Sequence, residues 1–311
     1  DLVLGYIPAD YFLGGDIKLD VARAHEAVAR VGSKLNMDLN QAAQAMFTTI
    51  NTVMSDLITE VCTKQGHDVR DFTLVAGGGA GGIHAAAIAR QLSIPMVIVP
   101  RVAALMSAFG MFAKDLGLEY ARSCFRSQKQ LDVAEIGGLY ADMRRQACED
   151  FERIGIAESQ MSYQPTVEMR YAGQFHEVEV DMPAQTLSAE TLQALLKNFH
   201  AKYEKMYTYS MTWRDAEFLT FRLKVTAPRR PVNLAPNAQA AGSIEAARRG
   251  SRRCLFDGQA VETPAYDWDR MEPGHKVAGP ALIDDKTTTV LVVPGFSCEV
   301  DAYRNLVLWA Q

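Results

Sequence analysis

The chain has 311 residues, 48% of them hydrophobic, and its 37 acidic residues outnumber its 32 basic ones to give a formal charge of −5. A single hydrophobic core stops growing at about 250–300 residues, so we expect more than one domain. The acidic balance argues against nucleic acid as a ligand, because phosphate polymers are bound through a basic surplus.

The placement of cysteine, histidine and apolar residues excludes further classes of protein. The five cysteines are widely spaced and never in a CxxC arrangement, which argues against a disulfide framework and a thiolate zinc site. The histidines are too dispersed for a recognisable cluster, so we expect no metal held by this chain alone. The most apolar stretch, residues 95–113, is interrupted by Pro100 and Arg101 and falls short of the roughly 20 apolar positions of a membrane helix. We therefore expect a soluble, cytoplasmic protein with no membrane partner.

Residues 1–127 are predicted to form a parallel α/β layer, because helices and strands alternate along this region. The chain opens at Asp1 inside a strand-like apolar run, so we expect it to be part of something longer. A helix is predicted from Asp38 and Gln41, which have capping-box spacing, to about Lys64. After the helix come a short buried strand at 72–76, a glycine-rich turn, a helix at 83–92 and a strand at 95–99.

The rest of the chain is predicted to contain two further domains. Residues 128–227 indicate an α+β domain, with a helix capped by Asp132 and Glu135 and strands on both sides of another helix. Residues 228–253 are rich in Pro, Ala and Arg and predict a linker, and residues 254–311 predict a small all-β domain. The linker contains four arginines that we interpret as a solvated charge run: Arg248, Arg249, Arg252 and Arg253.

The most informative segment lies between the predicted strand at 72–76 and the helix at 83–92. Glycines permit positive φ angles and let the backbone approach a flat or anionic ligand, so a nucleotide is one candidate ligand. The spacing is neither that of a P-loop nor a complete GxGxxG motif, and a tight turn that binds nothing is the equal alternative. The candidate binding residues of the segment are Gly77, Gly78, Gly79, Ala80, Gly81 and Gly82.

Two further polar residues are candidates for ligand contact. His84 lies about one turn into the helix that follows the glycines, where it could donate to a ligand or satisfy a carbonyl group. Asn51 lies in the middle of the first predicted helix, where it could bind a ligand or be exposed. No triad-type nucleophile is visible, so we assign no catalytic residue to this chain.

Several motifs, taken together in this order, resemble the hydantoinase A/oxoprolinase family, and they span nearly the whole chain. The segment around Gly66 to Phe72 and the glycine segment are similar to the family's adenosine-side loop. The family usually has an aromatic residue at the position of Gly77 and a proline at that of Gly82, so we expect this loop to be more flexible. The other similar segments are residues 1–15, 100–110, 170–174 and 279–283.

The resemblance implies a partial actin/sugar-kinase-like (ribonuclease H-like) lobe, followed by the α+β and all-β domains. In that fold ATP lies in a cleft between two lobes, and the glycine segment would contact the adenosine. Family members carry two glycine-threonine phosphate loops that this chain lacks. The resemblance therefore implies that ATP is bound with Mg²⁺ and that its phosphates and metal are held mainly outside this chain.

The family contains two branches of enzyme, and the first fifteen residues favour the ketone carboxylases. The resemblance implies a subunit of a hetero-oligomeric, ATP-dependent acetone or acetophenone carboxylase, a ligase that activates bicarbonate and the ketone's enol by phosphorylation. Its partners would be other subunits, including one that supplies the phosphate-binding lobe, and it would not be active alone. The alternatives are a subunit of an ATP-dependent hydantoinase or oxoprolinase, which acts on a cyclic amide, and a structural subunit with a vestigial nucleotide site.

Overall fold

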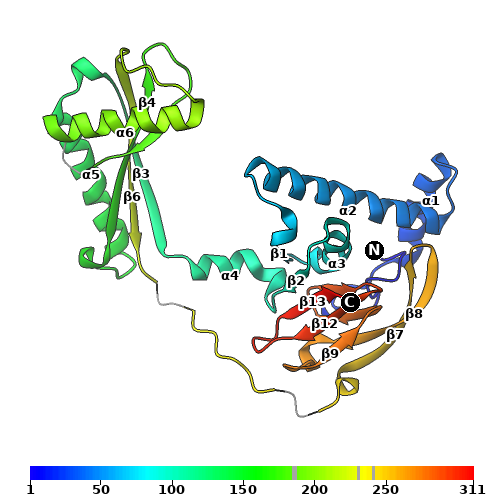
Figure 1. The fold of residues 1–311 in the computed structure, drawn as a ribbon. Coiled ribbons are helices and arrows are strands. Elements are labelled where there is room, and N and C mark those ends of the chain that lie inside the picture. The colour runs from blue at the N-terminus through cyan, green and yellow to red at the C-terminus, as the bar shows by residue number, and fades with distance from the viewer. Residues whose placement is uncertain (184–187, 230–231, 240–241) are drawn as a thin grey trace. The chain divides into compact units, whose positions relative to one another are not determined.

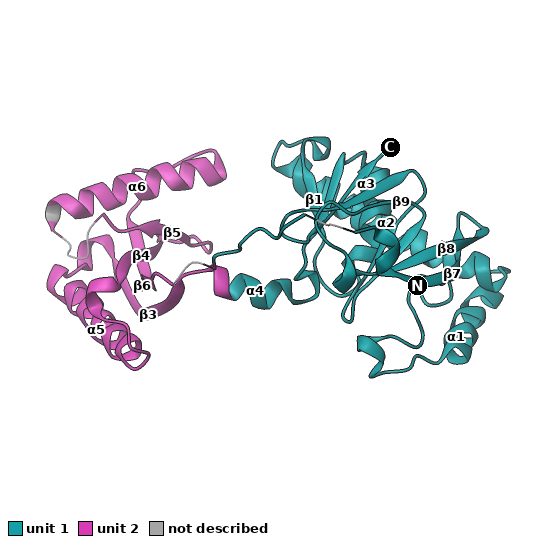
Figure 2. Ribbon diagram, turned by 90° about the horizontal axis from the view of Figure 1, so that it is seen from below, with its two compact units in different colours: residues 1–111, 233–311 teal, residues 112–232 magenta. Residues whose placement is uncertain are grey.

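The computed structural model describes residues 1–183, 188–229, 232–239 and 242–311. The chain forms two compact units (Figure 2): unit 1 combines residues 1–111 with 233–311, and unit 2 consists of residues 112–232. Unit 2 is therefore inserted into the sequence of unit 1. These boundaries differ from the breaks predicted after residues 127, 227 and 253.

Two helices of unit 1 begin where side chains satisfy their free backbone N–H groups. Asp38 and Gln41 form the predicted capping box of the long helix α2, which confirms that helix. Asp20 caps α1, a helix that the sequence analysis did not predict, by accepting a hydrogen bond from the N–H group of Arg23. The helices are α1 (Val21–Lys34), α2 (Leu39–Lys64), α3 (Gly81–Leu92) and α4 (Met106–Ala113), the last of which crosses into unit 2.

A five-stranded sheet combines strands from both sequence segments of unit 1 (Figure 1). β1 (Thr73–Val75) and β2 (Met96–Val99) are parallel, as predicted, but Val75 is 55% exposed, so β1 is not the buried strand that was expected. β2 then pairs antiparallel with β13, which places Val97 opposite Leu308. The strand order is β1, β2, β13 (Leu306–Ala310), β12 (Phe296–Val300) and β9 (Lys276–Ala278).

The remaining C-terminal strands form a second, four-stranded sheet in unit 1. Every residue of β10 (Ala281–Asp284) and β11 (Thr289–Val292) is buried, because both faces of these strands are covered and α3 packs against β11. Residues 254–311 are therefore β-rich, as predicted, but they do not form a separate domain, since they share one core with α3 and β2. The strand order is β11, β10, β8 (Gln259–Asp267) and β7 (Arg248–Phe256).

Unit 2 has its own core, formed by one antiparallel sheet and two helices. The helices and strands predicted for this region are confirmed, whereas two strands that precede and follow α5 were not predicted. Burial alternates along β6 because its two faces meet different surroundings. The elements are β3 (Leu116–Ser127), α5 (Val133–Glu152), β4 (Ser162–Tyr171), β5 (Val178–Asp181), α6 (Ala189–Tyr207) and β6 (Ala216–Ala227), with strand order β3, β6, β4, β5.

Short 3₁₀ helices form many of the turns between these elements. In the described part of the chain, no helix combines the length and apolar composition that a membrane span requires. None of the five cysteines forms a disulfide. The 3₁₀ helices are Leu13–Gly15, Val69–Asp71, Ala103–Leu105, Gln128–Gln130, Glu158–Gln160, Ile244–Ala247 and Trp268–Arg270.

Candidate functional site

The candidate site is centred on the glycine loop, defined as residues 76–80, which joins β1 to α3. The loop leaves the carboxyl end of β1, which is parallel to β2, and leads directly into α3. Residues 77–80 are all exposed. Gly78 has a φ of +89° and open space where a Cβ atom would stand, a backbone conformation that favours glycine. A ligand can therefore approach the backbone closely at Gly78.

The N–H group of Ala76 donates to the carbonyl oxygen of Ile98 and continues the pairing of β1 with β2. Beyond this residue, two hydrogen bonds hold the glycine loop from segments that are distant in the sequence. The N–H group of Gly78 donates to the carbonyl oxygen of Ala103 at 2.6 Å. The Oγ1 hydroxyl of Thr288, in the β10–β11 turn, donates to the carbonyl oxygen of Gly79 at 2.9 Å. The loop is thus exposed to solvent and anchored at two successive residues.

An exposed apolar surface adjoins the glycine loop. A Cβ atom at Gly77 would lie 3.5 Å from the Cβ atom of Met106, so these two residues are in contact. Val102 and Leu105, in the same turn as Met106, are among the exposed large hydrophobic residues. The glycine backbone, which carries no side chains, and the neighbouring apolar side chains together form a surface that fits a flat, largely apolar ring such as a nucleobase.

The last two predicted loop residues belong to α3. Gly81 begins the helix and Gly82 lies in its first turn, where it is buried. A Cβ atom at Gly82 would lie 2.8 Å from Cγ2 of Val290 and 2.9 Å from the carbonyl oxygen of Thr289, so close packing against β11 requires glycine here. The flexibility expected at this position is not what the structure has, because Gly82 is fixed between a helix and a sheet.

Asn51 and His84 lie together, between α2 and α3. Nδ1 of His84 is 2.8 Å from Oδ1 of Asn51, and the imidazole ring stacks on Phe47 with centroids 5.0 Å apart. Burial lowers the pKa of His84 below its ordinary value. Asn51 is buried rather than exposed, and its side-chain oxygen has the His84 ring as its hydrogen-bond partner. His84, but not Asn51, borders a cavity of about 490 Å³ that also touches Asp1.

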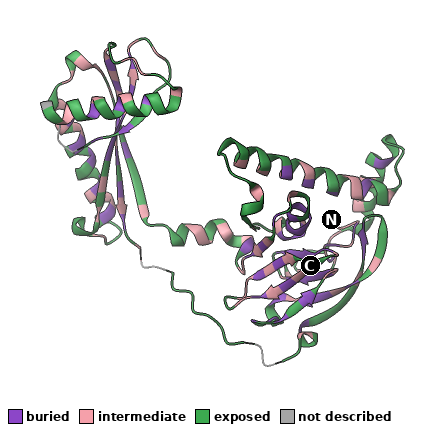
Figure 3. Cartoon of the chain, in the orientation of Figure 1, coloured by how far each residue is buried: buried purple, intermediate pink, exposed green. Residues whose placement is uncertain are grey.

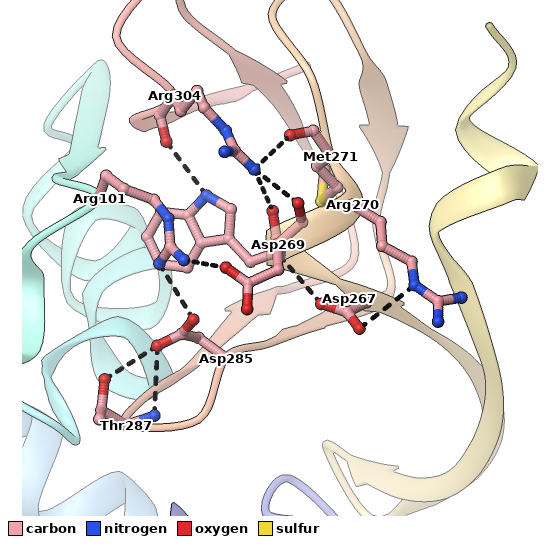
Figure 4. Close-up of polar contacts among 9 residues, drawn as sticks. Arg101, Asp267, Asp269, Arg270, Met271, Asp285, Thr287 and Arg304 are labelled. Carbon is pink, nitrogen blue, oxygen red and sulfur yellow. Dashed lines mark hydrogen bonds and ion pairs between the residues drawn. The ribbon is translucent and has the colours of Figure 1, made fainter. Parts of the chain in front are cut away.

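A polar cluster that was not predicted surrounds Arg101 (Figure 4). Its guanidinium donates to Oδ1 of Asp285 at 3.0 Å, pairs with Asp269, and lies over the ring of Trp268 with the Cζ atom 5.0 Å from the ring centroid. Asp285 also accepts two hydrogen bonds from Thr287. Burial would raise the pKa of Asp285, but the bonds from Thr287 and the charge of Arg101 outweigh it and hold the pKa below its ordinary value. In the sequence, Arg101 interrupts an apolar stretch and lies within the family-like segment 100–110, and neither observation identified its partners.

A cavity of about 260 Å³ lies beside the glycine loop. Its lining is largely apolar, and it is bounded by the β10–β11 turn and by the turn-rich segment near the start of the chain. A small ligand bound in this cavity would contact Gly79 and Ala80. Side chains that line it include Ile7, Tyr11, Phe12, Ile83 and Lys286.

The four arginines of the predicted linker do not all behave as a solvated charge run. Arg248, Arg249 and Arg253 are exposed, as that interpretation implies, whereas Arg252 is only partly exposed. Arg252 lies in β7 and binds the buried carboxylate of Asp284 through two nitrogens, at 2.6 and 3.0 Å. Arg249 lies over the ring of Tyr11, with 3.5 Å between its Cζ atom and the ring centroid. The interpretation is wrong for Arg252 because its acidic partner is distant in the sequence. Among the described residues, Arg249 has a ring contact and Arg252 has an ion pair, whereas Arg253 has neither.

Two family models match the chain along almost its whole length. The model described as "Hydantoinase/oxoprolinase" matches residues 1–120, and "Hydantoinase/oxoprolinase C-terminal domain" matches residues 124–310. The chain belongs to the hydantoinase/oxoprolinase family. The family predicted from the sequence motifs is therefore confirmed.

Relatives in this hydantoinase/oxoprolinase family include subunits of two different enzymes. The chain is 30% identical to the caprolactamase subunit alpha of Pseudomonas jessenii and 28% identical to the acetone carboxylase beta subunit of Xanthobacter autotrophicus, covering 97% of this chain in each case. A nucleotide-free structure of acetone carboxylase, from work on ATP-dependent acetone carboxylation, matches 100% of this chain with a TM-score of 0.76 and 26% identity. The mixed α/β fold is thus similar to that of acetone carboxylase.

The chain spans less than half the length of these relatives. It covers 44% of each of the two curated relatives and 46% of the matched acetone carboxylase chain. The activities of these relatives therefore belong to proteins more than twice as long as the part that this chain matches.

Proposed function

We propose that this chain supplies the adenosine-binding side of the ATP site in a multisubunit, ATP-dependent ketone carboxylase. The observation that carries the proposal is the glycine loop, which is exposed at residues 77–80 and anchored through Gly78 and Gly79. Its fit to a nucleoside rests on the open space beside Gly78 and the adjoining apolar surface at Met106. Similarity to acetone carboxylase along the whole chain supports the choice of reaction.

In this proposal the residues of the chain orient the nucleotide and carry no covalent chemistry. ATP, when bound, supplies the phosphoryl group that activates an oxygen of bicarbonate and of the ketone's enol. Phosphoryl transfer depends mainly on positioning and charge neutralisation. Among the described residues, no group of His, Cys, Asp or Glu side chains is arranged to hold a metal ion, and the proposal places Mg²⁺ with the phosphates on another polypeptide.

An exposed apolar stripe on α2 supports a partner polypeptide. The stripe consists of large apolar residues at helical spacing, each between 39% and 58% exposed. Much of α2 is coloured as exposed in Figure 3. β1 pairs with β2 alone among the described strands, so its other edge is open. The partner would bind at these surfaces and hold the phosphates. The stripe comprises Met46, Ile50, Val53, Leu57 and Val61.

A second candidate function is hydrolysis of a cyclic amide. The identity to the caprolactamase alpha subunit, 30%, is as high as that to the acetone carboxylase subunit, 28%. The same nucleotide loop would then serve to activate an amide oxygen. The two functions differ in the second substrate, which a turnover assay separates.

The test compares nucleotide binding and turnover in the chain purified together with its co-purifying subunits. ATP consumption is measured with acetone or acetophenone plus bicarbonate, and separately with hydantoin, 5-oxoproline or caprolactam. Consumption that requires a ketone and bicarbonate supports the carboxylase, and consumption that requires a cyclic amide supports the second candidate. A complex that binds no ATP would leave a structural subunit with a vestigial site.

A pair of glycine variants assigns binding to the loop. Gly78→Val and Gly155→Val both place a β-branched residue at a positive φ with open space around it, so both carry a backbone strain of about 1–3 kcal/mol. Only Gly78→Val alters the glycine loop, because Gly155 follows α5 in unit 2. We expect ATP affinity to fall in Gly78→Val and to be unchanged in Gly155→Val. Equal affinities in the two variants would contradict the assignment.

A further inference from the structure

The hydrogen bonds that anchor Gly78 and Gly79 come from two segments that Arg101 connects. The acceptor for the N–H group of Gly78 is Ala103, two residues from Arg101 in the turn after β2. The donor to Gly79 is Thr288, in a turn that contains Asp285, the ion-pair partner of Arg101. One side chain therefore connects the two segments that hold the loop.

The guanidinium of Arg101 is itself held in place. It lies over Trp268 and between the carboxylates of Asp285 and Asp269 (Figure 4). Trp268 is fully buried, and its Nε1–H group donates to the carbonyl oxygen of Arg304 at 3.1 Å. The backbone N–H group of Arg101 donates to Oδ1 of Asn305 at 3.0 Å. A planar guanidinium with these partners has little freedom to move.

Asp285 transmits the position of Arg101 to the β10–β11 turn. Its Oδ2 atom accepts hydrogen bonds from the N–H group and the hydroxyl of Thr287, at 3.2 and 2.9 Å. Its own N–H group donates to the carbonyl oxygen of Thr288 at 2.9 Å. Thr288 in turn is buried and donates its hydroxyl to Gly79. The carboxylate thus fixes the turn from which the loop is held.

We propose that Arg101 is a positioning residue for the nucleotide loop, acting through Asp285 and Thr288 on Gly79 and through its own turn on Gly78. The inference rests on the proposed function for its effect on nucleotide affinity, but not for its effect on the loop itself. A loop of glycines loses much conformational freedom when it is ordered. Anchors that order the loop in advance reduce the cost of binding, so their removal should weaken nucleotide affinity.

Unit 2 contains a matched control for this cluster. Arg222 also bridges two carboxylates, Glu168 and Glu119, each at 2.7 Å, and its side chain is exposed to a similar degree, 30% against 27% for Arg101. Arg222→Met removes an equivalent ion-pair bridge from a unit that contains no part of the glycine loop. An effect common to both arginines would be general to the chain.

The experiment uses the full chain with its co-purifying subunits and two measurements. Hydrogen exchange of peptides covering residues 76–82 reports loop order, and titration with ATP and with ADP reports affinity. The variants are Arg101→Met, Thr288→Val, which removes the donor at nearly constant shape, and Thr288→Ser, which retains it. In the first two variants we expect faster exchange and about tenfold weaker binding, which corresponds to the loss of about one hydrogen bond. Thr288→Ser and Arg222→Met should behave nearly as the wild type.

The outcomes separate the inference from the proposed function. Unchanged exchange at residues 76–82 in Arg101→Met, or equal changes in Arg222→Met, would overturn the positioning role. If the wild-type complex binds no nucleotide but residues 76–82 still exchange faster in Arg101→Met than in the wild type, the positioning role is sustained and the proposed function is overturned. If Arg101→Met does not fold, the Thr288 pair decides alone: exchange that is equal in Thr288→Val and Thr288→Ser overturns the inference.

A double variant tests the route of coupling. If Arg101 acts through Thr288, the effect of Arg101→Met on the exchange of the Gly79 peptide should be smaller in a Thr288→Val background than in the wild type. Strictly additive effects on this peptide would show that the route through Thr288 is not used and would overturn that part of the inference.

Discussion

Replacement of Arg252 by methionine should destabilise unit 1 more than other substitutions in the arginine-rich segment. The guanidinium forms two bonds to the carboxylate of Asp284, which is only 2% exposed, and two longer ones to the carbonyl oxygens of Gly5 and Tyr6, at 3.3 and 3.2 Å. Methionine retains the aliphatic stem but leaves a buried carboxylate without its cation. Removing one partner of such a pair costs about 3–5 kcal/mol. That is a large fraction of the roughly 5–15 kcal/mol by which a domain is stable.

Urea unfolding followed by tryptophan fluorescence measures this effect. Trp268 and Trp309 report unit 1 and Trp213 reports unit 2. With a urea dependence of about 2 kcal/mol per molar, the unit 1 midpoint should fall by about 2 M while the unit 2 transition stays in place. The adjacent Arg253→Met is the control, because Arg253 is exposed, and it should change stability by no more than about 0.5 kcal/mol. Equal midpoints for the two arginine variants would refute the reasoning.

Three further predictions concern reactivity, pH and assembly. Cys298 is buried, and burial raises the pKa of its thiol, so alkylation at pH 8 followed by peptide mass spectrometry should modify it only after unfolding, whereas half-buried Cys62 reacts in the native chain. Burial lowers the pKa of His200, so the unfolded state takes up its proton first and unit 2 should lose stability as pH falls below about 6.5; His200→Gln should flatten this dependence in thermal melts, and an unaltered slope would exclude His200 as its source. Leu57→Asp, on the exposed stripe of α2, should leave the melting temperature unchanged and reduce the recovery of co-purifying subunits, and full recovery would show that the stripe is not the interface.

Local chemistry accounts for the elements that the sequence predicted correctly. The capping box of Asp38 and Gln41 requires only neighbours three residues apart, and the alternating pattern of β6 is equally local. The parallel pairing of β1 with β2 follows from one intervening helix. Helix α1 was missed although Asp20 caps it and Val21, Ala24, Val28 and Val31 recur at helical spacing, so the local signal for this helix was present in the sequence.

The features that sequence reasoning missed depend on partners far apart in the chain. The pairing of β2 with β13 joins residues near 97 to residues near 308, and nothing in either segment identifies the other. Arg252 and Arg101 were interpreted from their sequence neighbours, yet their carboxylate partners are Asp284, at the end of β10, and Asp285, in the β10–β11 turn. At the candidate site, the glycines were predicted from backbone chemistry, whereas the anchor from Thr288 required knowledge of the tertiary fold.

The position of β13 in the middle of the five-stranded sheet has a consequence for biosynthesis. β2 lies between β1 and β13, so after the ribosome has made residue 99 one side of this strand waits for a segment that ends at Ala310. Unit 2 occupies one continuous stretch and can complete its core during that interval. We therefore expect the inserted unit to fold before unit 1 is complete, while residues 1–111, with apolar side chains uncovered, depend on chaperones until β13 emerges.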